Sequence, residues 1–183
     1  MTAQARKRGL APLECEDARI LILGTLPGDE SLRRQQYYAH PQNQFWRILS
    51  AVYGETISGD YGERRAFVLR HRLAVWDVLA SADRDGSLDF AIKKPEPNEF
   101  GPFFACYPEI SAIGFNGHCA DRLFQRYVAK TNDGDLAHAI RRTILPSTSA
   151  AATRPFDEKL AAWRAFLTDV TPSRYRALDV LSR

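Results

Sequence analysis

Three short segments of the chain bring glycine, hydroxyl, amide and aromatic residues together at close spacing. The first, GTLPG at 24–28, places two glycines around a proline, which is typical of a tight turn with exposed backbone N–H groups. Such groups can stabilise a negative charge that develops on a ligand. Neither common phosphate loop, GxGxxG or GxxxxGKS/T, matches this segment. A plain structural turn is therefore the alternative interpretation.

The second segment, YYAHPQNQFW at 37–46, combines aromatic and amide side chains. Two adjacent tyrosines cannot easily both face a core, and one flat ring at the mouth of a cleft can stack on a planar ligand. Asn43 stands just before a predicted helix, so its amide can either take part in chemistry or cap the helix N-terminus. No serine or cysteine motif near His40 would form a catalytic triad with it. This histidine can instead support the loop by hydrogen bonds.

The third segment, PSTSAAATR at 146–154, is rich in small and hydroxyl residues. Small residues let a backbone approach a ligand closely, and hydroxyl and N–H groups bind phosphate oxygens. A surface loop that leads into the last helix is the alternative.

The sequence predicts neither a metal site nor a cofactor. Cys15, Cys106 and Cys119 are widely spaced and form no CxxC pair, which argues against a disulfide framework or a zinc ribbon. Cys106 and Cys119 together with His118 match no common metal site. We expect free, buried thiols in a reducing cytoplasm.

Composition indicates one ordinary globular domain over residues 1–183. The chain has 45% hydrophobic and 26% charged residues and a net charge of +3. Only five of its 25 basic residues are lysines, and arginine binds phosphate well, although biased codon usage also explains this excess. The charge permits an anionic partner without requiring one. Without an apolar run of membrane length or a secretory signal, we expect neither a membrane span nor secretion.

Continuous apolar runs alternate with helical spacing along the chain. This pattern indicates an α/β fold with a mainly parallel sheet. Residues 81–102 contain three prolines and many charges and are predicted to be mostly loop. Residues 1–17 and 172–183 are expected to be terminal extensions. Strands are predicted at 19–24, 73–79, 111–115 and 142–145, and helices at 45–53, 60–72, 120–128 and from about 155 to 171.

Polar residues follow the carboxyl ends of these strands. Parallel sheets bind their ligands at this edge. Asp77 and Asn116 come at the ends of the second and third strands, and the first and third segments directly follow the first and fourth. The carboxyl ends of parallel strands meet at one edge, so we expect these residues to form one site.

GTLPG, YYAHPQNQFW and PSTSA together resemble the motifs of the uracil-DNA glycosylase superfamily, over about Ile20 to Leu167. WDV at 76–78 and GFNG at 114–117 are similar to the hypoxanthine-DNA (deoxyinosine) glycosylase branch, which is related to the mismatch-specific uracil/thymine glycosylases. The resemblance implies a three-layer α/β/α sandwich with a short, mainly parallel four-stranded central sheet. It also implies a monofunctional DNA glycosylase of base excision repair that flips out deaminated bases, hypoxanthine first and uracil second.

The resemblance also implies roles for residues of the first two segments. The mismatch-specific branch has a catalytic asparagine where this chain has Leu26, which cannot orient water. The hypoxanthine branch relies instead on the asparagine of the second motif, Asn43 here, whose amide would position water near the sugar carbon. The flipped base would lie against Tyr38. The backbone N–H groups of Thr25 and Leu26 would stabilise the departing base anion.

Asp77 and Asn116 are the further base-binding candidates. Asp77 stands where uracil-specific relatives place a base-reading side chain. A carboxylate only accepts hydrogen bonds, so it would favour the N–H of hypoxanthine or uracil over the acceptor nitrogen of adenine or cytosine. An aspartate that caps or braces a loop is the alternative. Asn116 would orient the site or hold a turn.

The third segment is the expected DNA contact, since related enzymes push this loop into the helix beside the flipped base. Ser147, Thr148, Ser149 and Arg154 would bind DNA, with Ala151 at the tip. Bulky apolar side chains usually wedge between bases, so a tip of alanines predicts a weak wedge. The expected partner is DNA with a deaminated base, and the expected state is a monomer. A catalytically inactive nucleic-acid-binding relative and a small-nucleoside hydrolase remain alternative functions.

Overall fold

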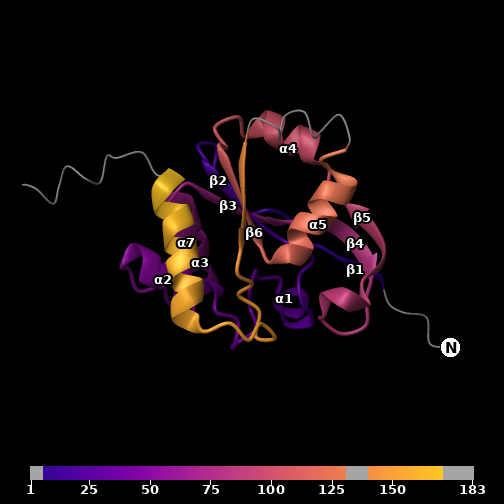
Figure 1. The fold of residues 1–183 in the computed structure, drawn as a ribbon, viewed down its shortest axis with the longest axis horizontal. Helices are drawn as coiled ribbons and strands as arrows, with labels where there is room; N and C mark the ends of the chain where they lie inside the picture. The colour runs from indigo at the N-terminus through magenta and orange to yellow at the C-terminus, as the bar shows by residue number, and fades with distance from the viewer. Residues whose placement is uncertain (1–5, 131–139, 171–183) are drawn as a thin grey trace, which may run out of the picture.

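A computed structural model describes residues 6–130 and 140–170 of the chain and has a four-stranded parallel sheet at its centre (Figure 1). Its strand order is β3-β2-β6-β7, and all three neighbouring pairs are parallel. This confirms the predicted sheet. The strands are β2 (Ile20–Gly24), β3 (Leu73–Asp77), β6 (Ala112–Asn116) and β7 (Arg141–Leu145).

Helices cover both faces of this sheet and make the three-layer sandwich that the resemblance implies. In Figure 1, α2, α3 and α7 lie on one side of the strands, and α4 and α5 lie on the other. Each residue of β2 and β3 is buried, as expected for strands with helices on both faces. The helices are α1 (Asp29–Arg34), α2 (Phe45–Tyr53), α3 (Tyr61–Arg70), α4 (Phe100–Cys106), α5 (His118–Tyr127) and α7 (Phe156–Val170).

Local sequence signals explain where two of these helices begin and end. The apolar stripe of α2 is buried, and the helix ends at Gly54, whose φ of +68° suits a residue without a side chain. Helix α3 begins after Asp60, whose side chain accepts a hydrogen bond from the Glu63 N–H. Helix α3 ends two residues earlier than predicted, because the chain turns at His71 and Arg72 into β3.

The prediction that one strand spans 73–79 and is followed by a loop over 81–102 was wrong. Strand β3 ends at Asp77, and the chain continues as β4 (Leu79–Asp83) of a second, antiparallel sheet with β5 (Lys93–Pro97). The 3₁₀ turn η1 (Asp89–Ala91) and the first three residues of helix α4 also lie in the region predicted as loop. The prolines were misleading because β5 is an edge strand, where proline is tolerated.

The N-terminal extension predicted over 1–17 was also wrong in part. Strand β1 (Arg6–Arg8) pairs antiparallel with β4, and Leu13 pairs with Val75 of the central sheet. Strand β1 has no apolar pattern. The Arg6 guanidinium instead forms ion pairs with Asp83 and Glu96, which link this strand to the rest of its sheet. The extension predicted at 172–183 lies outside the described residues.

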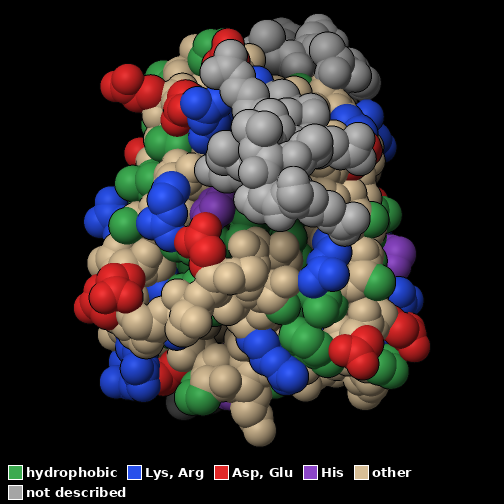
Figure 2. Space-filling view, turned by 90° about the vertical axis from the view of Figure 1, so that its left-hand side faces the viewer, with side chains coloured by type: hydrophobic (Ala, Val, Ile, Leu, Met, Phe, Trp, Pro, Cys, Tyr) green, Lys and Arg blue, Asp and Glu red, His purple; other side chains and the backbone are tan. Residues whose placement is uncertain are grey.

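Where described residues are visible in Figure 2, the face formed by α2, α3 and α7 carries basic and acidic side chains interspersed. None of the helices in the described part of the chain has the length and apolarity needed to cross a membrane.

Candidate active site

The carboxyl ends of the central strands meet at the end of the molecule where α1 and the β7–α7 loop lie, at the bottom of Figure 1. Gly24, the last residue of β2, pairs with Asp77, the last residue of β3. A methyl group on Gly24 would clash with Asp77 Oδ1 and would lie 3.5 Å from Tyr38 Oη. The expected convergence of Gly24, Asp77 and Tyr38 is therefore observed, and it requires glycine at position 24.

The two adjacent tyrosines differ in burial, and both pack against the core. Tyr37 is buried, and its hydroxyl donates to the Leu10 carbonyl. The ring of Tyr38 stacks on Phe45, with 3.8 Å between centroids and 24° between planes. Tyr38 has a φ of +53°, a left-handed conformation that costs a bulky residue about 1–3 kcal/mol. Strain of this kind marks a side chain whose position is fixed by its surroundings.

The polar atoms of Tyr38 and Asp77 are buried without partners. Neither Tyr38 Oη nor Asp77 Oδ2 forms a hydrogen bond within the described residues. Burial raises the pKa of the Tyr38 hydroxyl, and the Asn116 amide beside it opposes this shift only in part. Buried polar atoms are nearly always paired in folded proteins, and both of these atoms belong to side chains that border Gly24, which makes this edge a candidate ligand site.

The Asp77 side chain is only 5% exposed, and this burial changes the chemistry expected of it. Burial, with the charge of Asp89 adding to it and Arg84 opposing it, raises the pKa of Asp77 to about 8. At neutral pH the group is mainly a neutral acid, with one O–H donor and one carbonyl acceptor. Burial thus favours the neutral acid over the acceptor-only carboxylate expected from the sequence.

Two residues that sequence reasoning missed, Arg84 and Asp89, hold the loop after β2. The Arg84 guanidinium is 1% exposed and donates to the carbonyl oxygens of Leu26, at 3.0 Å, and Pro27. The Thr25 hydroxyl donates to Asp89 Oδ1 at 2.6 Å. No sequence signal pointed to either residue, because both belong to the stretch predicted as loop.

These contacts fix the backbone of the loop after β2 without using its N–H groups. Within the described residues, neither the Thr25 nor the Leu26 N–H donates to a protein acceptor. The Leu26 side chain itself is buried. The backbone N–H groups of this loop are therefore available as donors, and their role toward a bound anion stays a prediction.

Asn43 lies at the N-terminus of α2, where both of its predicted roles are chemically possible. Its Oδ1 accepts a hydrogen bond from the Phe45 N–H at 3.0 Å, which satisfies one free donor of the first helical turn. Gln44 is the residue directly before the helix, and its side chain makes no capping bond. The Asn43 amide N–H₂ group has no protein acceptor within the described residues, so it is available to a ligand or to water.

The loop after β7 is braced from three sides. Asn116 Nδ2 donates to Thr148 Oγ1 at 2.9 Å, and the Thr148 N–H donates to Asn116 Oδ1 at 2.8 Å. The Thr148 carbonyl accepts the Gln44 N–H at 2.9 Å. The buried Lys159 ammonium joins Gln44 Oε1 to the Ala152 carbonyl, each at 3.0 Å. Asn116 therefore holds this loop, which is one of the two roles expected of it.

Only part of this loop is accessible to DNA. Thr148 is fully buried, so its predicted contact with DNA is wrong, because its hydroxyl and N–H are used by Asn116. Ser149, Ala151 and Arg154 are exposed, and Ser147 is half-buried. The Ser147 and Ser149 oxygens accept N–H groups within the loop, which holds it in two tight turns.

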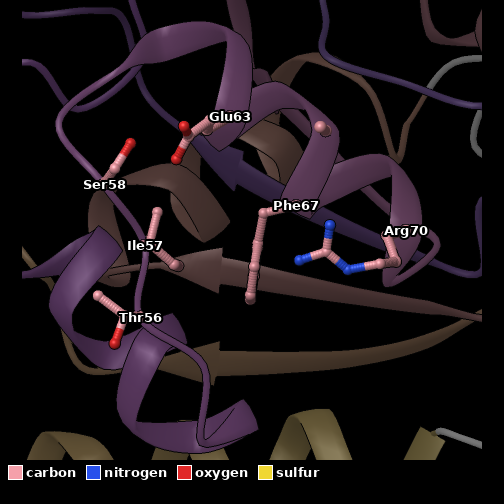
Figure 3. Close-up of a pocket in the computed structure, with 7 residues that line it drawn as sticks. Thr56, Ile57, Ser58, Glu63, Phe67 and Arg70 are labelled. Carbon is pink, nitrogen blue, oxygen red and sulfur yellow. The ribbon is translucent and has the colours of Figure 1, made fainter.

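A hollow of about 230 Å³ lies beside α3, away from these segments (Figure 3). Ile57 and Phe67 form its apolar part, with Ser58, Glu63 and Arg70 around them. No residue of the convergent strand ends lines it. The candidate active site is therefore the orphan pair Tyr38 and Asp77 with its two flanking loops.

Comparison with known proteins identifies the family to which this chain belongs. The family model for the uracil DNA glycosylase superfamily matches residues 11–171. The chain belongs to this superfamily. It is a DNA glycosylase, and its substrate is therefore DNA.

Curated and solved relatives of this glycosylase share most of its length. A hypoxanthine DNA glycosylase of Methanosarcina acetivorans is 34% identical over 165 residues, which is 87% of this chain and 96% of the relative. A hypoxanthine DNA glycosylase of Methanosarcina barkeri is 40% identical over 113 residues, which is 61% of this chain and 72% of the relative. The solution NMR structure of a candidate uracil DNA glycosylase from M. acetivorans has a TM-score of 0.77 and 32% identity, and covers 91% of this chain and 99% of its own.

The raised pKa of Asp77 predicts a pH-dependent effect of Asp77→Asn on the stability of the glycosylase. The native state holds a proton that the unfolded chain, with a pKa near the ordinary 3.8, releases. This stabilising contribution is complete below pH 4 and is lost as the pH rises through about 8. Asparagine cannot ionise, so thermal unfolding of the variant relative to the natural protein should shift upward by about 3 °C or more between pH 5 and pH 9. An equal difference at every pH would contradict this.

Proposed function

We propose that this glycosylase removes hypoxanthine from DNA, and uracil less readily, by hydrolysis that leaves an intact abasic site. One observation carries the proposal: the side chains of Tyr38 and Asp77 both border Gly24 at the sheet edge, and each holds a buried polar atom without a partner. Relatives named hypoxanthine DNA glycosylase, at 34% and 40% identity, support the choice of base. A flipped nucleotide is the ligand that would satisfy these atoms.

The base would stack on Tyr38 and pair with Asp77. Phe45 backs one face of the Tyr38 ring, so the opposite face is the one left for the base. Hypoxanthine presents an N–H beside a carbonyl oxygen on its pairing edge, and uracil does the same. The neutral acid of Asp77 can donate to such a carbonyl while it accepts from the neighbouring N–H.

Bond cleavage would pass through a sugar with oxocarbenium character and a base that leaves as an anion. The free N–H groups of Thr25 and Leu26, fixed from behind by Arg84 and Asp89, would stabilise the negative charge on the base. The Asn43 amide would position the attacking water. Hydrolysis is favoured over attack by an amine because the buried ammonium of Lys159 is held by two acceptors.

The direct test is a glycosylase assay on oligonucleotides with deoxyinosine, deoxyuridine, deoxyxanthosine or a thymine mismatch. We expect the highest single-turnover rate on deoxyinosine, with strand breakage only after alkali treatment. Release of hypoxanthine from free deoxyinosine at the same rate would indicate a nucleoside hydrolase. The absence of release from every oligonucleotide would indicate an inactive binding protein. Either result would contradict the proposal.

The two roles of Asn43 can be separated by a pair of variants. Serine keeps an oxygen that can accept the Phe45 N–H but lacks an amide N–H₂ group, whereas alanine lacks both. If the amide positions water, both variants should slow base release by roughly 10²-fold or more. Only Asn43→Ala should also lose about 1 kcal/mol of stability. The measurements are single-turnover rates and thermal unfolding, and full activity of Asn43→Ser would leave helix capping as the role of this residue.

The small side chains of the exposed β7–α7 loop predict a preference for poorly paired targets. A wedge of alanines recovers little of the unstacking free energy, so lesions that are easiest to extrude should react fastest. We expect faster hypoxanthine release from mismatched or single-stranded deoxyinosine than from well-paired duplex. Ala151→Leu should raise the rate on the well-paired duplex selectively, as measured by single-turnover kinetics at one salt concentration. Equal rates on all targets, with no gain from leucine, would refute the weak wedge.

A further inference from the structure

The turn between β4 and β5 exposes two large apolar side chains next to the active site. Phe90 is 87% exposed and Leu88 is 48% exposed, and Ile144 is the third exposed large apolar side chain within the described residues. An isolated exposed apolar residue is common on protein surfaces, but two on one turn form a patch that water solvates poorly. Asp89, which binds the Thr25 hydroxyl, lies between them in the chain. The patch therefore adjoins the loop that would hold the base.

This turn is held firmly although its tip is exposed. Ser87 Oγ accepts the Asp29 N–H at 2.9 Å, which attaches the turn to the start of α1. The Lys7 ammonium donates to the Gly86 carbonyl at 2.6 Å. The Arg84 and Asp89 bonds to the loop after β2 complete the attachment. Phe90 thus projects from a braced support, as a side chain that has to push into another molecule requires.

The surroundings of Phe90 suit a nucleic acid and not an apolar protein surface. Lys93 and Lys94 follow the turn directly and are exposed, and the Lys94 ammonium also pairs with Asp83 at 3.4 Å. Arg122 of α5 is also exposed and lowers the pKa of Asp89, against the larger effect of burial. An apolar tip with cations on its flanks matches the stacked bases and the phosphates of one duplex.

We propose that Phe90, with Leu88 beside it, enters the duplex next to the flipped nucleotide and stacks on the exposed neighbouring base. The proposal rests on the base flipping that is part of the function proposed above. Phe90 and the β7–α7 loop would approach the lesion from two sides, because one adjoins the loop after β2 and the other follows β7 at the far edge of the sheet. Phe90 would stack on the neighbouring base once the lesion has left the stack, and the alanine loop would still contribute little to the extrusion of a well-paired base.

A duplex with a stable abasic analogue tests this stacking without any dependence on base release. A 2-aminopurine beside the analogue reports the unstacking of the neighbouring base through its fluorescence. We expect Phe90→Ala to bind this duplex roughly tenfold or more weakly than the natural protein and to lose most of the fluorescence change. Phe90→Tyr, which keeps an aromatic ring, should behave like the natural protein. Both variants should unfold at the natural temperature, since the side chain is 87% exposed.

The outcomes separate this proposal from the proposed function. If Phe90→Ala binds the duplex and changes the fluorescence as the natural protein does, Phe90 does not stack on DNA. If Phe90→Ala and Phe90→Tyr lose affinity equally, the ring is not what binds, and the proposal is also wrong. If the natural protein shows the Phe90-dependent fluorescence change but releases no hypoxanthine, the wedge stands and the proposed substrate fails.

Discussion

The site depends on the absence of a side chain at the end of β2. Gly24 lets Asp77 of the neighbouring strand and Tyr38 of a distant loop approach the backbone at one point. Any larger residue would displace the Asp77 carboxyl, and with it the group proposed to pair with the base. The parallel register fixes this contact, because Gly24 and Asp77 are direct partners between two fully buried strands. Movement of either strand would carry its whole buried set of side chains with it.

The close approach of Tyr38 and Asp77 to Gly24 is energetically unfavourable in the protein without a ligand. Each buried polar atom without a partner costs about 1–3 kcal/mol, and the left-handed Tyr38 adds a similar amount. The rest of the core, with fully buried Phe45 beneath Tyr38, supports this state. A ligand that pairs with these atoms recovers their hydrogen-bonding free energy without first ordering them. Preorganisation of this kind is what binding of a flipped base requires.

The sequence predicted the parts of the structure that local apolar patterns specify. All four central strands and helices α2, α3, α5 and α7 have such patterns, and their predicted limits agree with the structure within a few residues. Helix α1 has only six residues, too few for a periodic pattern. Arg84 and Asp89 act on a loop about 60 residues away in the chain, so their role follows from the fold alone. The protonation of Asp77 also depends on burial, which residue type does not reveal.

The loops after β7 and β2 flank the active site and are held by different contacts. They also differ in the side chains that lie exposed beside them, which bears on the mechanism. On the β7 side, Asn116 and Thr148 form a reciprocal pair, and the loop presents small side chains. On the β2 side, Arg84 fixes the loop whose N–H groups we propose as donors to the base anion, and the same turn carries Phe90. A force on Phe90 would therefore pass directly to the backbone beside the leaving base. In the proposed mechanism, insertion of the turn into DNA and alignment of these donors are one event, so the enzyme would gain its full set of contacts only on a strand from which a base has left the stack.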